Sequence, residues 1–199
     1  MNNKFVFETN AHAEIISNFF DIVNIDHEVS ETSIFIKANT IQSFANYDTK
    51  LSNTSASKLL NSFTITIKFL NKFNYTIPFL QCDKAYLINE DIFIPLNLIE
   101  ITDNAILIEN IYEKSDPYLS YELTKINELP TRIHAKSCYF SLAKFIIHFL
   151  FYYKKTIPKD SDYSSYLNTI YGSKLYWILN HCLNTDPNLR MLIIINIDN

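Results

Sequence analysis

The sequence predicts an α+β protein in which a small mixed lobe, residues 1–45, precedes a mainly helical lobe, residues 46–199. Two segments indicate strands. Polar and apolar residues alternate in "KFVFE", residues 4–8, and "TSIFIKAN", residues 32–39, is rich in β-branched and aromatic residues. Between them, apolar residues recur every three or four positions over residues 11–23, which is the period of a helix. The small lobe is therefore expected to run strand, helix, strand, with Asn10 as the helix cap.

The second lobe is expected to begin with a polar connection over residues 46–57 and a long helix over residues 56–73. Two short strands, residues 85–89 and 91–96, should be joined by a turn at Asn89-Glu90-Asp91, because Asn and Asp favour turns. The remaining expected elements are one strand followed by four helices, at residues 105–109, 137–153, 164–170, 173–183 and from Asp186-Pro187 toward 195.

Composition favours a globular protein with a substantial core, since 48% of the residues are hydrophobic and 15% are aromatic. The net charge of −4, without a basic run, argues against a nucleic-acid partner. The densest basic spot, Tyr152–Lys155, is interpreted as a solvated helix end. The abundance of Ile and Asn is typical of an AT-rich coding genome, such as that of some protists or large DNA viruses.

Cysteine and glycine usage excludes several kinds of site. Cys82, Cys138 and Cys182 are odd in number and include no C-x-x-C pair, which argues against disulfides or a zinc site and favours a reducing, intracellular compartment. Because Gly172 is the only glycine, no glycine-rich phosphate loop can form. The five histidines show no metal-ligand spacing, and the proximity of His134 to Cys138 is interpreted as a helical coincidence rather than a nucleophile–base pair.

One stretch, Tyr139–Tyr153, is apolar enough to suggest a membrane segment. It is too short to span a bilayer, however, and Lys144 and His148 interrupt it. We therefore expect a helix buried in a globular core, with His148 in the core or at an interface, and no membrane insertion.

Three segments of the second lobe, in order, resemble the C-terminal lobe of a protein kinase. "YLSYELTKI" is similar to the A-P-E end of the activation segment, and "CYFSLAKFIIHFLF" is similar to the hydrophobic helix that the family begins with D-x-W-S-x-G. "LYWILNHCLNTDPNLRM" resembles the closing helices with their C-L-x-x-D-P-x-x-R ending. The resemblance covers roughly residues 56–195, and residues 1–45 are either a reduced small lobe or unrelated to one.

The resemblance implies a structural ion pair between Glu122 and Arg190. Arginine suits a buried carboxylate because its charge persists and its planar fork can donate two hydrogen bonds. A surface arginine of little consequence is the alternative. Asp186 is expected to cap the helix that follows it, with Pro187 at the first position.

The same resemblance places no catalytic group where a kinase needs one. Leu80 would stand at the catalytic aspartate, Ala85 at the metal-binding asparagine, and Leu96 at the start of the D-F-G segment, residues 96–98. If these assignments are shifted by a few residues, three nearby carboxylates have to be considered, those of Asp83, Asp91 and Asp103. Four further positions depart from the family pattern: Phe7 or Glu8 for the lysine, Tyr121 for the A-P-E proline, Cys138 for the helix-starting aspartate, and Ala143 for its glycine. The resemblance would match Glu14 to the C-helix glutamate, although the lysine that this glutamate pairs with in the family has no counterpart here.

The resemblance thus implies a degenerate, catalytically inactive kinase-like protein, a pseudokinase, that acts as a protein-binding or scaffolding module. No catalytic residue, metal or cofactor is expected, ATP is not expected to bind, and the partner is expected to be another protein. Two alternatives stay open: a structural component of a virion or virus factory, and an active kinase with relocated catalytic residues. The expected location is intracellular, and cytoplasmic, virus-factory or virion sites all fit.

Overall fold

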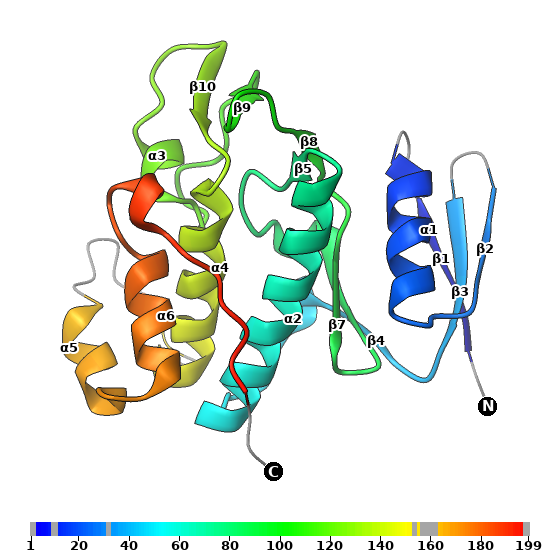
Figure 1. The fold of residues 1–199 in the computed structure, drawn as a ribbon, viewed down its shortest axis with the longest axis horizontal. Helices are drawn as coiled ribbons and strands as arrows, with labels where there is room; N and C mark the ends of the chain where they lie inside the picture. Colours follow the sequence, from blue (N-terminus) through cyan, green and yellow to red (C-terminus); the bar gives the residue numbers. More distant parts are fainter. Residues whose placement is uncertain (1–2, 9–11, 31–32, 153–154, 156–162, 197–199) are drawn as a thin grey trace.

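The computed structural model describes residues 3–8, 12–30, 33–152, 155 and 163–196. It is an α+β protein, with a small sheet-and-helix unit at one end and the longer helices at the other (Figure 1). The expected cap residue Asn10, and Tyr153 and Lys154 of the basic spot, lie outside the described residues.

The first unit is a three-stranded antiparallel sheet covered by one helix. Strand β1 (Asn3–Glu8) pairs with β3 (Ser33–Ala38), which also pairs with β2 (His27–Val29), and α1 (Ala13–Ile22) lies beside this sheet (Figure 1). The apolar stripe predicted for α1 is buried at Ile16, Phe19 and Phe20. Strand β2 was not predicted, because its three residues show no alternation of buried and exposed side chains.

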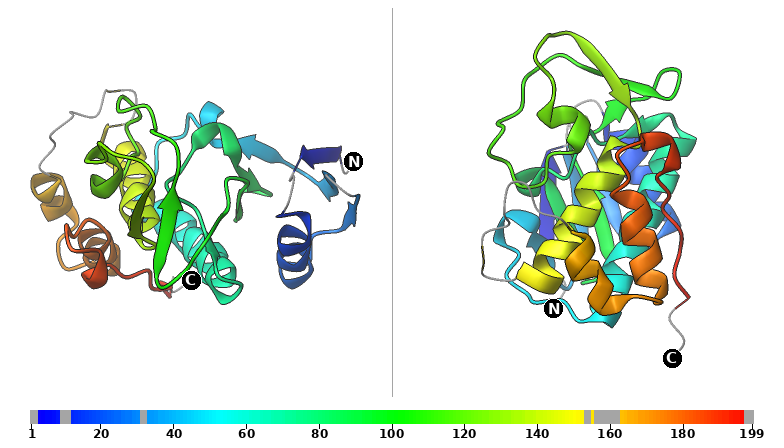
Figure 2. Two further views of the ribbon diagram at one scale, coloured as in Figure 1. Left: turned by 90° about the horizontal axis from the view of Figure 1, so that it is seen from above. Right: turned by 90° about the vertical axis from the view of Figure 1, so that its left-hand side faces the viewer.

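The first unit shares the larger of two hydrophobic clusters with the long helices and the β6–β7 segment, whereas residues around β9 and β10 form a second cluster. The ring of Phe19 in α1 lies 5.0 Å from that of Phe69, and the ring of Phe7 lies 4.9 Å from that of Tyr86. Figure 2 shows the unit attached at one edge of the molecule, reached through strand β4 (Ile41–Ser43). This strand falls within the predicted first lobe, yet it pairs with β6 (Ala85–Ile88) and not with the first sheet.

The hairpin of β6 and β7 (Ile92–Pro95) forms a second sheet in the order β4-β6-β7. Its predicted turn is present, with Asn89 and Glu90 in the left-handed region at φ 49° and 66°. The Oδ1 atom of Asn89 accepts hydrogen bonds from the backbone N–H groups of Asn39 and Thr40, at 2.8 and 3.3 Å. The turn is therefore tied to the segment that links the two sheets.

Helix α2 (Asn53–Lys72) begins three residues before the predicted start, because Ser52 caps it by accepting a hydrogen bond from the N–H of Ser55. Its β-branched and hydroxyl residues are accommodated by specific bonds to strand β7. Thr66 donates to the carbonyl of Phe93 at 2.7 Å, and the hydroxyl of Ser62 accepts from the Phe93 N–H at 2.8 Å. The helix thereby holds the hairpin while its apolar face fills the core.

Two further strand pairs precede the helical part. Strand β5 (Tyr75–Thr76) pairs with β8 (Ile99–Glu100), and β9 (Ala105–Ile108) pairs with β10 (Thr131–His134). The sequence predicted no strand at β10, because pairing with β9 and not its own pattern stabilises it. The intervening helix α3 (Tyr121–Thr124) is a single turn.

The helical part is built around α4 (Ser137–Ile147), which continues as a π-turn over His148–Tyr152. Beside it lie α5 (Ser164–Leu167) with a 3₁₀ turn over Asn168–Ile170, and α6 (Lys174–Cys182). The apolar stretch that suggested a membrane segment is largely buried in the core, as predicted. Among the described helices, none combines the length and the apolar character needed to cross a membrane.

The predicted last helix is wrong. Only a single 3₁₀ turn, Pro187–Leu189, follows Asp186, and residues 190–196 then run without helix beside α2 (Figure 1). The amide of Asn61 in α2 donates to the carbonyl of Ile195 and accepts from its N–H, each at 2.7 Å. This pair of bonds, with the burial of Leu192 and Ile195, stabilises the non-helical path of a segment rich in β-branched residues.

Candidate functional site

Arg190 is completely buried where the end of the chain meets α3 and α4. Its Nη2 atom lies 2.7 Å from Oε1 of Glu122, whose side chain is 16% exposed. The Nε–H group donates to the carbonyl of Asn184 at 2.7 Å, and Nη1 donates to that of Lys136 at 3.3 Å. The ion pair that the resemblance implies is therefore present, and the surface alternative for Arg190 is wrong.

Arg190 and Glu122 form an ion pair, but they are not joined by two parallel hydrogen bonds. Neither carboxylate oxygen of Glu122, nor Nη2 of Arg190, has a correctly oriented hydrogen-bond partner among the described residues. The short distance still brings the opposite charges together in a place from which water is excluded. The guanidinium carbon also lies 5.1 Å from the ring centre of Phe140 in α4. Arg190 thus joins three segments that are distant in the sequence.

Asp186 is a cap, as expected, but of a shorter element. Its Oδ1 atom accepts from the N–H of Asn188 at 2.9 Å and from the side-chain amide of Asn188 at 3.0 Å. Pro187 stands at the first position of the 3₁₀ turn. The cap sets the direction in which the chain enters the position of Arg190.

The three positions that the resemblance assigns to kinase catalytic groups are apolar and packed. Leu80 is fully buried and its backbone N–H donates to the hydroxyl of Ser141 at 2.7 Å. Ala85 is fully buried at the start of β6. Leu96 packs against the core, partly buried, with its N–H bonded to the carbonyl of Lys84 at 2.8 Å. The Leu80 and Ala85 side chains have no access to solvent or to a ligand.

The three nearby carboxylates do not come together in one site. Asp83, Asp91 and Asp103 are all exposed and lie on three different turns. Asp103 is 3.8 Å from Arg132 in an exposed ion pair. In the described part of the chain, no three His, Cys, Asp or Glu side chains converge in an arrangement that could hold a metal ion. In the first unit, Phe7 is buried and Glu14 is exposed.

The pairing of His134 with Cys138 as base and nucleophile finds no support in the geometry. The thiol of Cys138 is buried, lies 3.3 Å from the hydroxyl of Thr76, and contacts the carbonyl of Ala135. Burial raises the pKa of this thiol to about 11, which keeps it protonated and unreactive. Nδ1 of His134 accepts from the N–H of Lys136.

A half-buried polar cluster that the sequence did not reveal lies beside the Leu80 segment. Lys144 of α4 donates to the carbonyl of Leu119 at 3.1 Å, and Asp116 accepts from the N–H of Tyr118 at 2.8 Å. Burial lowers the pKa of Lys144 to about 8, partly offset by the charge of Asp116, and burial raises the pKa of Asp116. The Tyr118 hydroxyl is 2.6 Å from Nδ1 of His148. His148, which was expected in the core or at an interface, is half-buried and has this tyrosine as a partner.

Lys144 gives a pH-dependent prediction. Its pKa is lower in the folded state, about 8, than its ordinary value of 10.5. Between these values the unfolded chain binds more protons, so stability should rise with pH. Comparing thermal unfolding of the wild type and Lys144→Met from pH 7 to 10.5, we expect the wild type to gain at most about 3 kcal/mol relative to the variant.

The exposed Lys174 offers a matched control for this prediction. Lys174→Met removes a charge that is exposed to water. The stability of this variant should therefore depend on pH in the same way as that of the wild type. A wild-type profile parallel to that of Lys144→Met over the whole range would contradict the assignment.

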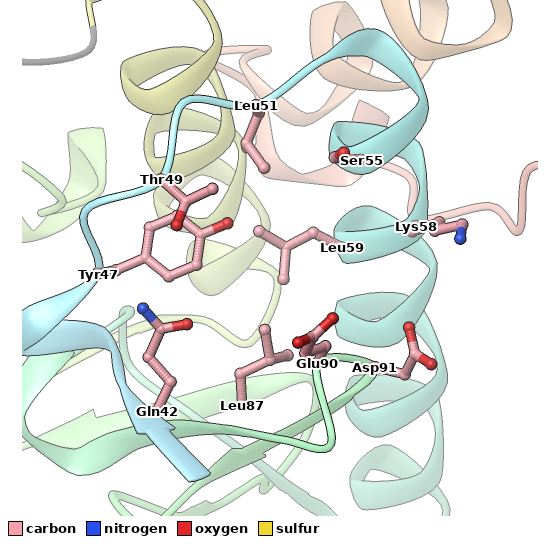
Figure 3. A pocket seen from close by; sticks show the side chains of 10 residues that line it. All are labelled: Gln42, Tyr47, Thr49, Leu51, Ser55, Lys58, Leu59, Leu87, Glu90 and Asp91. Atoms are coloured by element: carbon pink, nitrogen blue, oxygen red, sulfur yellow. The ribbon is translucent and has the colours of Figure 1, made fainter. Parts of the chain in front are cut away.

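A pocket of about 360 Å³ opens between the start of α2, the segment before it and the β6–β7 turn (Figure 3). It does not include Leu80, Ala85 or Leu96. Its walls combine apolar, hydroxyl and charged side chains: Gln42, Tyr47, Thr49, Leu51, Ser55, Lys58, Leu59, Leu87, Glu90 and Asp91. The sequence indicated the turn at residues 89–91, but the pocket depends on the meeting of three distant segments.

Comparison with models of protein families and with curated protein sequences finds no match to this chain.

Proposed function

We propose that this chain is a catalytically inactive protein with a protein kinase-like C-terminal lobe, and that it acts by binding another protein. The burial of apolar side chains at the positions of the catalytic base and the metal-binding asparagine carries the proposal. Leu80 and Ala85 are both fully enclosed. Phosphoryl transfer relies on positioned charged groups and magnesium, which such positions cannot supply.

The retained structural contacts support the kinase-like part of the proposal. The pair of Glu122 and Arg190 links the segment that resembles A-P-E to the segment that resembles the closing motif. The bond from Leu80 to Ser141 links the catalytic-loop counterpart to the buried helix α4. A chain that keeps these contacts while losing its catalytic groups fits a role in which the folded surface, and not chemistry, is used.

The proposal is tested by thermal unfolding with ATP and magnesium. We expect no change in melting temperature beyond that produced by magnesium alone, because the chain lacks the lysine, the glycine loop and the metal ligands. A ligand present at 100 times its dissociation constant would stabilise the protein by about 2.7 kcal/mol, which this measurement resolves.

An active protein kinase in the same buffer is the positive control for this experiment, and ATP without magnesium is the negative one. Stabilisation that saturates with ATP and requires magnesium would overturn the claim of inactivity. Co-purification from cells, with the wild-type chain as bait, tests the binding role: a defined protein partner is expected, and its absence would contradict that role.

A further inference from the structure

We propose that the pocket beside the β6–β7 turn receives an arginine side chain of the partner protein. This inference rests on the proposed function, because it assumes that the chain binds another protein. The pocket lies between the segment 47–51, the first turns of α2 and the turn of the hairpin (Figure 3). Its volume of about 360 Å³ is at the lower end of the range for ligand pockets, which suits a single long side chain.

The charge of the pocket favours a cation. Its charged lining residues are two carboxylates, Glu90 and Asp91, and one lysine, Lys58. Figure 3 shows the carboxylate of Glu90 pointing from the turn into the pocket, below Leu59. Neither Glu90 nor Asp91 forms an ion pair with another described residue, so both carboxylates are available to a bound cation.

The other walls of the pocket favour a bound side chain with an aliphatic stem and a planar end group. Leu51, Leu59 and Leu87 are buried lining residues whose apolar surfaces can pack along methylene groups. The half-buried ring of Tyr47 stands at one side, where a guanidinium can stack on it. Arginine combines the stem, a planar head that stacks, and donors for two carboxylates, whereas the ammonium of lysine is a compact, strongly hydrated charge.

The pocket is already formed in the free protein. The ring of Tyr47 lies 4.8 Å from that of Phe149 and 5.4 Å from that of Phe145, both on the segment of α4 and its π-turn. The N–H of Leu51 donates to the carbonyl of Phe149 at 3.0 Å. Asn89 holds the turn that carries Glu90 and Asp91. A wall and a turn held in this way need little ordering when a side chain enters.

Other occupants fit less well. Two carboxylates oppose a phosphate, and the chain has no glycine-rich loop to cradle one. A metal ion would need more converging ligands than the described residues bring together anywhere.

The test is a titration of the full chain, labelled with ¹⁵N, with N-acetyl-arginine amide as the probe. Amide signals of residues 47–59 and 87–91 should shift and saturate, with a dissociation constant of about 1–10 mM as expected for one side chain. N-acetyl-citrulline amide has the same shape without the charge and should cause no saturable shift. N-acetyl-lysine amide should bind about five-fold more weakly than the arginine probe.

The double variant Glu90→Gln with Asp91→Asn keeps the size of both side chains and removes both charges. It should bind the arginine probe about ten-fold more weakly. The matched control is Glu100→Gln with Asp103→Asn, which removes one glutamate and one aspartate from exposed positions outside the pocket. Equal binding of the citrulline or lysine probe, or unchanged binding by the first double variant, would overturn the proposal.

The same variants separate this inference from the proposed function. If the wild-type chain binds a protein partner and the Glu90→Gln, Asp91→Asn variant binds it about ten-fold more weakly, both stand. If the variant binds that partner as tightly as the wild type, the arginine inference fails and the proposed function stands. If the wild type binds no protein, the proposed function fails, and the probe titration alone decides whether the pocket selects arginine.

Discussion

Replacing Arg190 by methionine is expected to lower the free energy of unfolding by about 3–5 kcal/mol, the usual cost of removing one member of a buried ion pair. The change leaves Glu122, which is only 16% exposed, without its counter-charge. It also removes the donors to the carbonyls of Asn184 and Lys136. Urea denaturation, with the slope compared between variants, measures the loss.

The only other arginine of the chain is a natural control. Arg132 is half exposed, and its contact with Asp103 is 3.8 Å long. Arg132→Met should therefore cost less than about 1 kcal/mol. A double-mutant cycle of Arg190→Met with Glu122→Gln should give a coupling energy of about 1–3 kcal/mol. If Arg190→Met were no more destabilising than Arg132→Met, the structural role of the buried pair would be refuted.

Introducing an acid at position 80, which the resemblance assigns to the catalytic aspartate, should destabilise the protein instead of activating it. Leu80→Asp is expected to cost about 3–5 kcal/mol, because Leu80 is fully buried and a carboxylate placed there loses its hydration. Burial should raise the pKa of the introduced carboxyl above its unfolded value near 3.9. The folded variant would then bind more protons than the unfolded one, so its deficit in stability should shrink as the pH falls from 7 toward 5.

Leu80→Met is the matched control, since it keeps an apolar side chain of similar volume and should cost less than about 1.5 kcal/mol. Thermal unfolding at several pH values and a phosphoryl-transfer assay with magnesium and ATP should be run on both variants. A Leu80→Asp protein as stable as Leu80→Met at pH 7 would show that position 80 is open to solvent. Kinase activity in that variant would contradict the expectation that an acid at position 80 does not activate the protein.

Local sequence patterns were sufficient for the elements that carry a complete apolar face. The stripes of α1 and α2 predicted helices, and the turn residues at 89–91 predicted the hairpin, because burial on one face leaves a period in the sequence. Strand β10 and the end of the chain left no such period. Both depend on partners that are distant along the chain. Strand β10 is held by β9, and the end of the chain is held by Asn61.

The candidate sites divide in the same way. The amino-acid sequence by itself determined the single glycine, the apolar residues at positions 80, 85 and 96, and the motif that matched Arg190 to Glu122. Only the tertiary structure decided that Arg190 is wholly buried, that Leu80 is enclosed, and that the walls of the pocket meet the carboxylates of the hairpin turn. The physical reason is that the identity of a residue is fixed locally, whereas its burial is created by segments that are distant in the chain. Burial in turn sets how strongly two charges interact.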